Sequence, residues 1–142
     1  MPQKYVKKIL DARIYDLAIE TPVDAAPLLS KRLNNTVLLK REDLQPVFSF
    51  KLRGAYNKLR QLSKVERTGG VIAASAGNHA QGLALAAQKM GVDATIVMPK
   101  TTPRIKVDAV RGWGAKVILF GDNYNAAAEH ANQLVAEEGL TY

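Results

Sequence analysis

The stretch that decides the fold covers residues 71–82 and reads VIAASAGNHAQG. Its first four residues are apolar and predict a buried strand, and the serine, glycine and asparagine that follow predict a turn opening a helix. Further apolar runs begin at residues 94 and 116. Such even spacing, with helical segments between the runs, is typical of parallel strands joined by right-handed crossovers. The sequence therefore predicts an α/β fold with an open parallel sheet.

Capping residues predict where the helices between these strands begin and end. Thr102 is expected to cap one helix, with Pro103 at its first position. Asp122 or Asn123 is expected to cap the next. Glycines stand where the helices should end, at Gly91, Gly112 and Gly139. One more period would place a fourth strand near residue 140, so we expect the chain to be a portion of a longer polypeptide.

Upstream of the first strand the pattern is less regular. Residues 27–33 read as a short helix and residues 36–40 as a strand. Pro46 then breaks the chain before a further helix at residues 51–62.

The composition excludes several classes of protein. Hydrophobic residues make up 47% and charged residues 23%, which is ordinary for a folded domain. The chain has no cysteine, which excludes a disulfide framework and a thiolate zinc site. His79 and His130 lack companions at metal-ligand spacing, so no metal is expected. No apolar run approaches the roughly 20 residues of a membrane helix, so we expect a cytoplasmic protein that does not bind a membrane.

The net charge of +7 allows a non-enzymatic alternative, a basic nucleic-acid-binding module. Its basic residues would include Lys58, Arg60, Lys64 and Arg67. We interpret this cluster as a solvated helix face, because Leu59 and Leu62 supply the apolar side. A groove that follows phosphates would interleave aromatic residues, and this region offers only Tyr56. The nucleic-acid alternative is therefore disfavoured.

Lys51 is the first candidate for chemistry. It stands at the entry of a predicted helix within the segment SFKLRGA, residues 49–55. On residue type alone, a solvated charge is the ordinary interpretation. The functional interpretation is a Schiff-base lysine, whose amine must lose its proton before it attacks a carbonyl group.

The second candidate is the turn after the first regular strand, residues 75–79. A helix that begins at the carboxyl end of a parallel strand presents backbone N–H groups that suit a carboxylate or phosphate. The alternative is a capped turn without a ligand, with Ser75 or Asn78 as the N-cap. The residues leave these two interpretations about even.

Taken together, these segments resemble the fold-type II pyridoxal-phosphate enzymes, and within them the threonine dehydratases (threonine ammonia-lyases). Three stretches carry the likeness, and they read LKREDLQPV at residues 39–47, FSFKLRGAY at residues 48–56 and ASAGNHAQG at residues 74–82. The likeness extends over nearly the whole chain. The first stretch is more similar to the biosynthetic, isoleucine-pathway members than to the catabolic ones.

The resemblance implies roles for both candidate segments. Lys51 would be the catalytic residue and form the Schiff base with pyridoxal 5'-phosphate, and Asn78 would hydrogen-bond the ring hydroxyl oxygen of this cofactor. The carboxylate of a small amino-acid substrate would be bound by Ser75, Ala76, Gly77, Asn78 and His79. The implied reaction is the dehydration and deamination of L-threonine to 2-oxobutanoate and ammonia, the first step of isoleucine biosynthesis. The resemblance also implies a homo-oligomer.

Ala76 bears on the choice among relatives. Serine racemases typically carry a serine at this position as a second base, and alanine cannot transfer a proton. The resemblance therefore favours elimination over racemisation. It leaves a serine dehydratase, or another fold-type II lyase, as the alternative.

Family geometry would assign residues 1–50 to the large domain and residues 51–142 to the small α/β domain. The glycine-rich loop that holds the cofactor phosphate would lie beyond Tyr142. Activity is therefore expected of the complete enzyme rather than of this chain alone.

Overall fold

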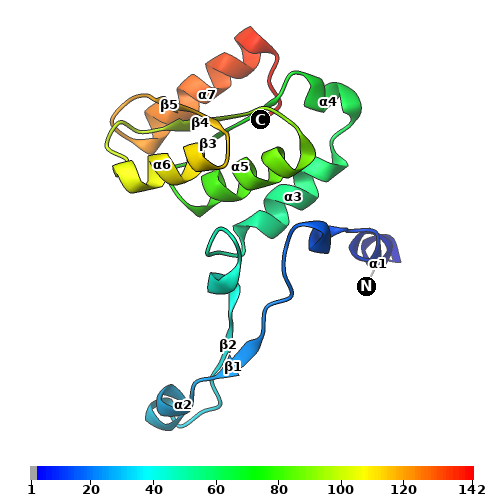
Figure 1. Ribbon diagram of the computed structural model, residues 1–142, viewed down its shortest axis with the longest axis vertical. Coiled ribbons are helices and arrows are strands. Elements are labelled where there is room, and N and C mark those ends of the chain that lie inside the picture. The colour runs from blue at the N-terminus through cyan, green and yellow to red at the C-terminus, as the bar shows by residue number, and fades with distance from the viewer. Residues whose placement is uncertain (1–2) are drawn as a thin grey trace.

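A parallel sheet lies at the centre of the protein's body in the computed structural model, which describes residues 3–142 (Figure 1). Its strands, in spatial order, are β3 (Val71–Ala74), β4 (Ala94–Met98) and β5 (Lys116–Leu119). Neighbouring strands are parallel throughout, with Ile72 opposite Thr95 in the first pair. The predicted α/β fold with an open parallel sheet is confirmed.

Helices cover both faces of this sheet, because parallel strands are apolar on both sides (Figure 1). These helices and the others of the body are α3 (Lys51–Gln61), α4 (Lys64–Thr68), α5 (Asn78–Met90), α6 (Arg104–Gly112) and α7 (Tyr124–Glu138). Ile72 and Val97 pack in the cluster beneath α7, whereas Ala73 and Ile96 pack in the cluster formed with α3, α5 and α6. Alternate side chains of these strands thus point to opposite faces of the sheet and pack into two separate hydrophobic cores.

The strand side chains form the best buried part of the molecule. Ile72, Ile96, Val97 and Met98 are each at most 1% exposed. Full burial of such a side chain stabilises the folded state by roughly 1.5–3 kcal/mol. The result is a rigid scaffold for the loops at the carboxyl edge of the sheet, where candidate functional residues are expected.

Several helix ends agree with the sequence prediction. Asn123 caps α7, and its Oδ1 accepts a 3.0 Å hydrogen bond from the N–H of Ala126. Gly91 and Gly139 end α5 and α7 in the left-handed conformation. These are the positions where glycine lacks the steric penalty of a Cβ.

The predicted ends of α6 are wrong. Pro103 is the N-cap, in an extended conformation with ψ 137°, so the helix begins one residue later at Arg104. Thr102 does not cap it, and its hydroxyl oxygen is buried without a hydrogen-bond partner. Gly112 is the last helical residue rather than the cap, and it is Gly114 that adopts a positive φ, of 82°.

At the position of the expected fourth strand the structure has one isolated bridge and no further strand of the sheet within residues 3–142. Thr141 forms a parallel bridge with Val71, on the edge of β3 opposite to β4. The N–H of Thr141 donates to the carbonyl oxygen of Gly70 at 3.0 Å, and the N–H of Ile72 donates to that of Thr141 at 2.9 Å. The Thr141 hydroxyl also donates to the carbonyl oxygen of Glu66 at 2.7 Å.

The elements that precede α3 are together called the arm. They are α1 (Gln3–Leu10), a 3₁₀ turn at Ile14–Asp16, β1 (Val23–Ala25), α2 (Pro27–Leu33), β2 (Leu38–Lys40) and a 3₁₀ turn at Glu42–Leu44. Of these, β1, β2 and α2 extend away from the body, whereas α1 and the first 3₁₀ turn lie close to it (Figure 1). Strands β1 and β2 pair antiparallel, and α2 lies at the tip of the arm, far from the sheet. The predicted helix at residues 27–33 is confirmed.

The arm leaves large apolar side chains in solvent. Ile9 is 66% exposed, Leu28 85% and Leu38 58%. The assignment of residues 1–50 to a separate large domain stays a prediction.

Candidate active site

Lys51 is the first residue of α3, and a tight loop delivers it there. The chain reverses at Phe48, which adopts a φ of 54°. The first turn of α3 is anchored by Leu52, which is fully buried against Ala18, Val47 and Leu85. The Lys51 side chain is exposed, and its Nζ lies 5.1 Å from the centroid of the Phe50 ring. Buried neighbours therefore fix the lysine backbone while the amine stays accessible.

The turn at residues 75–79 follows β3 directly, as predicted. The N–H of Ser75 donates to the carbonyl oxygen of Val97 at 3.1 Å, which ties the turn to β4. The Ser75 hydroxyl accepts a 3.3 Å hydrogen bond from the N–H of Gly77. Gly77 is the N-cap of α5, and Asn78 is its first helical residue.

The interpretation of Ser75 or Asn78 as the N-cap is wrong. Gly77 occupies the cap position and makes no side-chain capping bond. No side chain of the described residues satisfies the first N–H groups of α5 by capping. These groups suit a carboxylate or phosphate, since a helix start carries partial positive charge.

Packing of α3 on α5 brings Lys51 and this turn together. Gly82, in the second turn of α5, lies against the first turn of α3, and a Cβ built on it would stand 2.9 Å from the amide nitrogen of Leu52. Partial burial lowers the pKa of His79 below its ordinary value, and the charge of Lys51 lowers it further. Both causes favour the neutral form of the His79 imidazole, and the second places this side chain near Lys51.

A cavity of about 420 Å³ opens beside Lys51 and His79. It continues along α3 and β3, past mostly apolar side chains, to Thr141 and Tyr142. Ser75, Ala76, Gly77 and Asn78 do not line it, so the predicted substrate-binding turn meets the cavity only at His79. Lys58 is exposed, as the interpretation of a solvated helix face expects, and it also lines the cavity.

The residues present fit an aldehyde cofactor of the pyridoxal phosphate type. The hydroxyl of Ser49, two residues before Lys51, is buried without a hydrogen-bond partner. An accessible amine, an unsatisfied hydroxyl and a free helix start are the donors that such a cofactor and an amino-acid substrate require. Within residues 3–142, no group of three or more histidine and acidic side chains is arranged to hold a metal. His130 instead stacks on Phe120, with ring centroids 4.0 Å apart.

Sequence reasoning missed three features of this site. Gly82 carried a signal, because glycine inside a helix is unfavourable and often marks a close backbone approach. The unpartnered hydroxyl of Ser49 carried none. The ion pair between Glu42 and Arg53 was also missed, because charges 11 positions apart outside one helix do not predict a contact.

The fold and this site define a class, an α/β domain in which an exposed lysine and the first turn of a helix border one cavity. The chain belongs to the pyridoxal-phosphate dependent enzyme family, whose sequence profile matches residues 14–142. The family resemblance found in the sequence is confirmed.

Curated relatives are similar to this chain over nearly its whole length. The biosynthetic, chloroplastic threonine dehydratase of Arabidopsis thaliana is 57% identical over 139 residues, which cover 98% of this chain and 24% of that protein. The biosynthetic L-threonine dehydratase IlvA of Burkholderia multivorans is 57% identical over 141 residues, covering 97% of this chain and 28% of that protein. The chain thus spans about a quarter of the length of these relatives.

Solved structures with the same fold include a threonine deaminase and a serine racemase. The processed form of threonine deaminase isoform 2 from Solanum lycopersicum superposes with a TM-score of 0.93 at 53% identity, covering 99% of this chain and 39% of that one. Maize serine racemase superposes with a TM-score of 0.89 at 30% identity, covering 96% of this chain and 42% of that one.

Proposed function

We propose that the complete protein containing this chain is a pyridoxal 5'-phosphate-dependent threonine dehydratase. It would convert L-threonine to 2-oxobutanoate and ammonia in isoleucine biosynthesis. One observation carries the proposal: Lys51 and His79, the last residue of the turn after β3, line one cavity in a chain 57% identical to biosynthetic threonine dehydratases.

Lys51 has two tasks in this proposal. Its Nζ would hold the cofactor, and the same amine would accept the proton from Cα of the substrate. When bound, pyridoxal phosphate supplies an electron sink that stabilises negative charge at that carbon. The accessible amine and the fully buried Leu52 beside it support this role, because the backbone is held while Nζ stays free to move.

The turn binds and orients the amino-acid substrate. The backbone N–H groups at the start of α5 receive its carboxylate, within the segment Ser75, Ala76, Gly77, Asn78 and His79. Asn78 would also hold the cofactor, by donating to its ring oxygen. The absence of a side-chain cap at Gly77 supports the carboxylate site, because the donors are not already used.

Ala76 supports elimination rather than racemisation. Its methyl group cannot deliver a proton to Cα of the substrate, so the loss of the β-hydroxyl proceeds without competition from reprotonation on that side. Serine, which also carries a β-hydroxyl, is the alternative substrate.

We infer further that the enzyme is cytoplasmic and assembles as a homo-oligomer. The exposed apolar side chains of the arm support assembly. None of the helices within residues 3–142 combines the length and apolar character needed to cross a membrane. The nucleic-acid alternative has no support beyond net charge.

Turnover of the complete protein tests the proposal. We expect release of 2-oxobutanoate from threonine only when pyridoxal phosphate is present, with serine turned over more slowly. Cofactor-independent turnover would contradict the proposal, and faster turnover of serine would identify a serine dehydratase.

A further inference from the structure

The ion pair between Glu42 and Arg53 joins the arm to the helix that carries Lys51. Arg53 Nε donates to Glu42 Oε2 at 2.7 Å, and Arg53 Nη2 donates to Glu42 Oε1 at 2.9 Å. The Arg53 side chain is only 20% exposed and the Glu42 side chain 15%. Two parallel bonds between a guanidinium and a carboxylate fix orientation as well as distance.

Further hydrogen bonds extend the pair into a network. The Thr21 hydroxyl donates to Glu42 Oε1 at 2.5 Å, and Arg53 Nη2 also donates to the carbonyl oxygen of Ile19 at 3.2 Å. Gln45 forms two bonds with the backbone of Ile19, one in each direction, at 3.0 and 2.8 Å. Thr21 and Gln45 are 3% and 1% exposed. We call these five residues the Glu42–Arg53 clamp.

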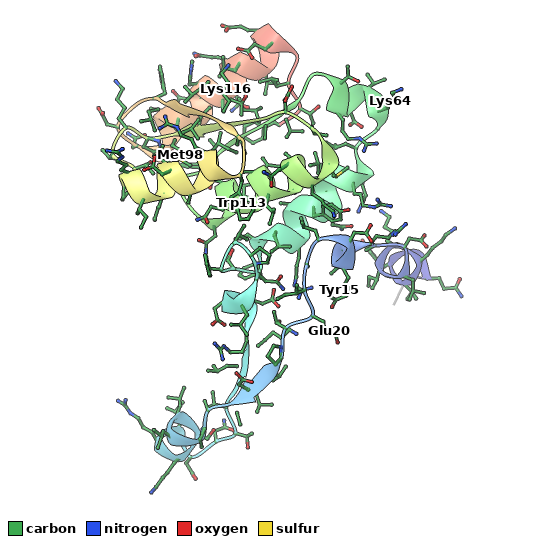
Figure 2. The ribbon with its side chains drawn as sticks, viewed as in Figure 1. Tyr15, Glu20, Lys64, Met98, Trp113 and Lys116 are labelled. Atoms are coloured by element: carbon green, nitrogen blue, oxygen red, sulfur yellow. The ribbon has the colours of Figure 1, made fainter. Side chains whose placement is uncertain are left out.

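The clamp encloses the segment that delivers Lys51. Gln45 lies before this segment, and Arg53 stands two residues after the lysine. Arg53 is further held by Tyr15, whose ring centroid lies 5.3 Å from the guanidinium carbon, and Figure 2 shows Tyr15 where the arm meets α3. Gly82 supports the same helical turn from the α5 side, since a Cβ on it would stand 3.0 Å from the carbonyl carbon of Lys51.

We propose that Glu42 and Arg53 are positioning residues that hold the start of α3 so that Lys51 Nζ is presented for covalent capture of pyridoxal phosphate. This inference rests on the proposed function. The clamp fixes the backbone on both sides of Lys51 without contacting its amine. Misplacement of a reacting group by about 1 Å can reduce its reactivity about 100-fold.

The clamp does not switch within the physiological pH range. The hydrogen bonds from Arg53, aided by those from Thr21 and Gln45, lower the pKa of Glu42 to about 2. The carboxylate raises the pKa of Arg53 above its ordinary value. Both groups are therefore charged wherever the enzyme would work, and the clamp is a constant constraint.

The test uses Glu42→Gln and Arg53→Lys in the complete protein. Matched controls are Asp43→Asn and Arg41→Lys, which alter an arm ion pair that does not reach α3. Capture is measured by borohydride trapping of the cofactor on Lys51, read by mass spectrometry, and by titration of the visible absorbance of the bound cofactor. Thermal unfolding of the cofactor-free proteins separates capture from stability.

We expect both clamp variants to bind pyridoxal phosphate about 10- to 100-fold more weakly and to trap it more slowly, whereas the controls match the wild type. At saturating cofactor, the kcat of the clamp variants for threonine should fall with little change in the KM for threonine. Cofactor capture at the wild-type level in both clamp variants would overturn the inference. It would also be overturned if capture fell in proportion to thermal stability, in the clamp variants and the controls alike. If Glu42→Gln does not fold, Arg53→Lys alone decides. Failure of the wild type to trap cofactor on Lys51 would instead overturn the proposed function, and this inference with it.

Discussion

Gly82 lies against the backbone of Lys51 with no space for a side chain between them. A Cβ on Gly82 would stand 3.0 Å from the Lys51 carbonyl carbon and 2.9 Å from the Leu52 amide nitrogen. Both neighbours are backbone atoms, which cannot move aside as a flexible side chain can. The helices α3 and α5 can therefore approach this closely at Lys51 only because residue 82 has no side chain.

We predict that Gly82→Ala displaces the start of α3 and destabilises the fold by about 1–3 kcal/mol, the usual cost of overpacking. Cofactor capture at Lys51 should weaken as well. Gly112→Ala is the control, because a Cβ on Gly112 would meet no neighbouring atom within 4 Å and the φ of this residue is not positive. Denaturant unfolding and cofactor titration measure both effects. Equal stability of the two variants would show that the helices tolerate the separation.

Replacement of Lys51 by alanine should abolish covalent cofactor attachment and lower kcat by about 100- to 10,000-fold or more, because the proton acceptor is lost. Lys89→Ala is the control, since Lys89 is exposed in the last turn of α5. Lys58 is unsuitable because it lines the cavity. Trapped cofactor on the Lys51→Ala protein would mean that another lysine holds it.

The titration of His79 reports the proximity of Lys51 directly. Its pKa is lowered first by burial and second by the charge of Lys51. Lys51→Met removes only the second cause, so the pKa of His79 should rise yet stay below its ordinary value. Titration followed by NMR measures this change. An unchanged pKa would contradict the juxtaposition of the lysine and the turn.

The parts of this protein that follow short-range rules could be predicted from the sequence. The strand β3 and the turn after it are encoded by an apolar run followed by a serine, an alanine, a glycine and an asparagine. The cap Asn123 and the end of α5 at Gly91 rest on the conformational preferences of single residues. Each of these features depends on neighbours within a few positions.

The features that were mispredicted or missed depend on distant contacts. The Glu42–Arg53 pair joins the arm to α3, and its charges are indistinguishable in the sequence from solvated ones. Lys58 is exposed, as predicted, but that it also lines a cavity depends on the packing of α3 beside β3 and Thr141. The start of α6 was misplaced by one residue, because Pro103 can serve either as cap or as first helical residue.

Acid should reveal the stability that Glu42 contributes. Its folded-state pKa is about 2, against an ordinary value of 4.5, so its contribution is fully present above about pH 4.5 and is lost as the pH falls toward 2. At neutral pH, Glu42→Gln should destabilise by about 1–3 kcal/mol, because Arg53 loses its charged partner.

This difference between wild type and Glu42→Gln should shrink as the pH falls from 4.5 toward 2. Urea unfolding at a series of pH values measures it. Asp43 also has a lowered pKa, but its titration is common to both proteins and cancels in the comparison. A difference that stays constant across this pH range would show that the carboxylate is not held in its charged form.

The arm yields the last prediction. Leu28 and Leu38 are 85% and 58% exposed, and burial of each would contribute roughly 1.5–3 kcal/mol. We therefore expect a 142-residue chain prepared alone to self-associate as its concentration rises. The double variant Leu28→Asp with Leu38→Asp should shift this association to higher concentration. Val65→Asp should not, because Val65 is 83% exposed on α4, away from the arm. Light scattering over a concentration series decides: a wild-type chain that stays monomeric throughout, or equal shifts in both variants, would show that the arm does not drive assembly.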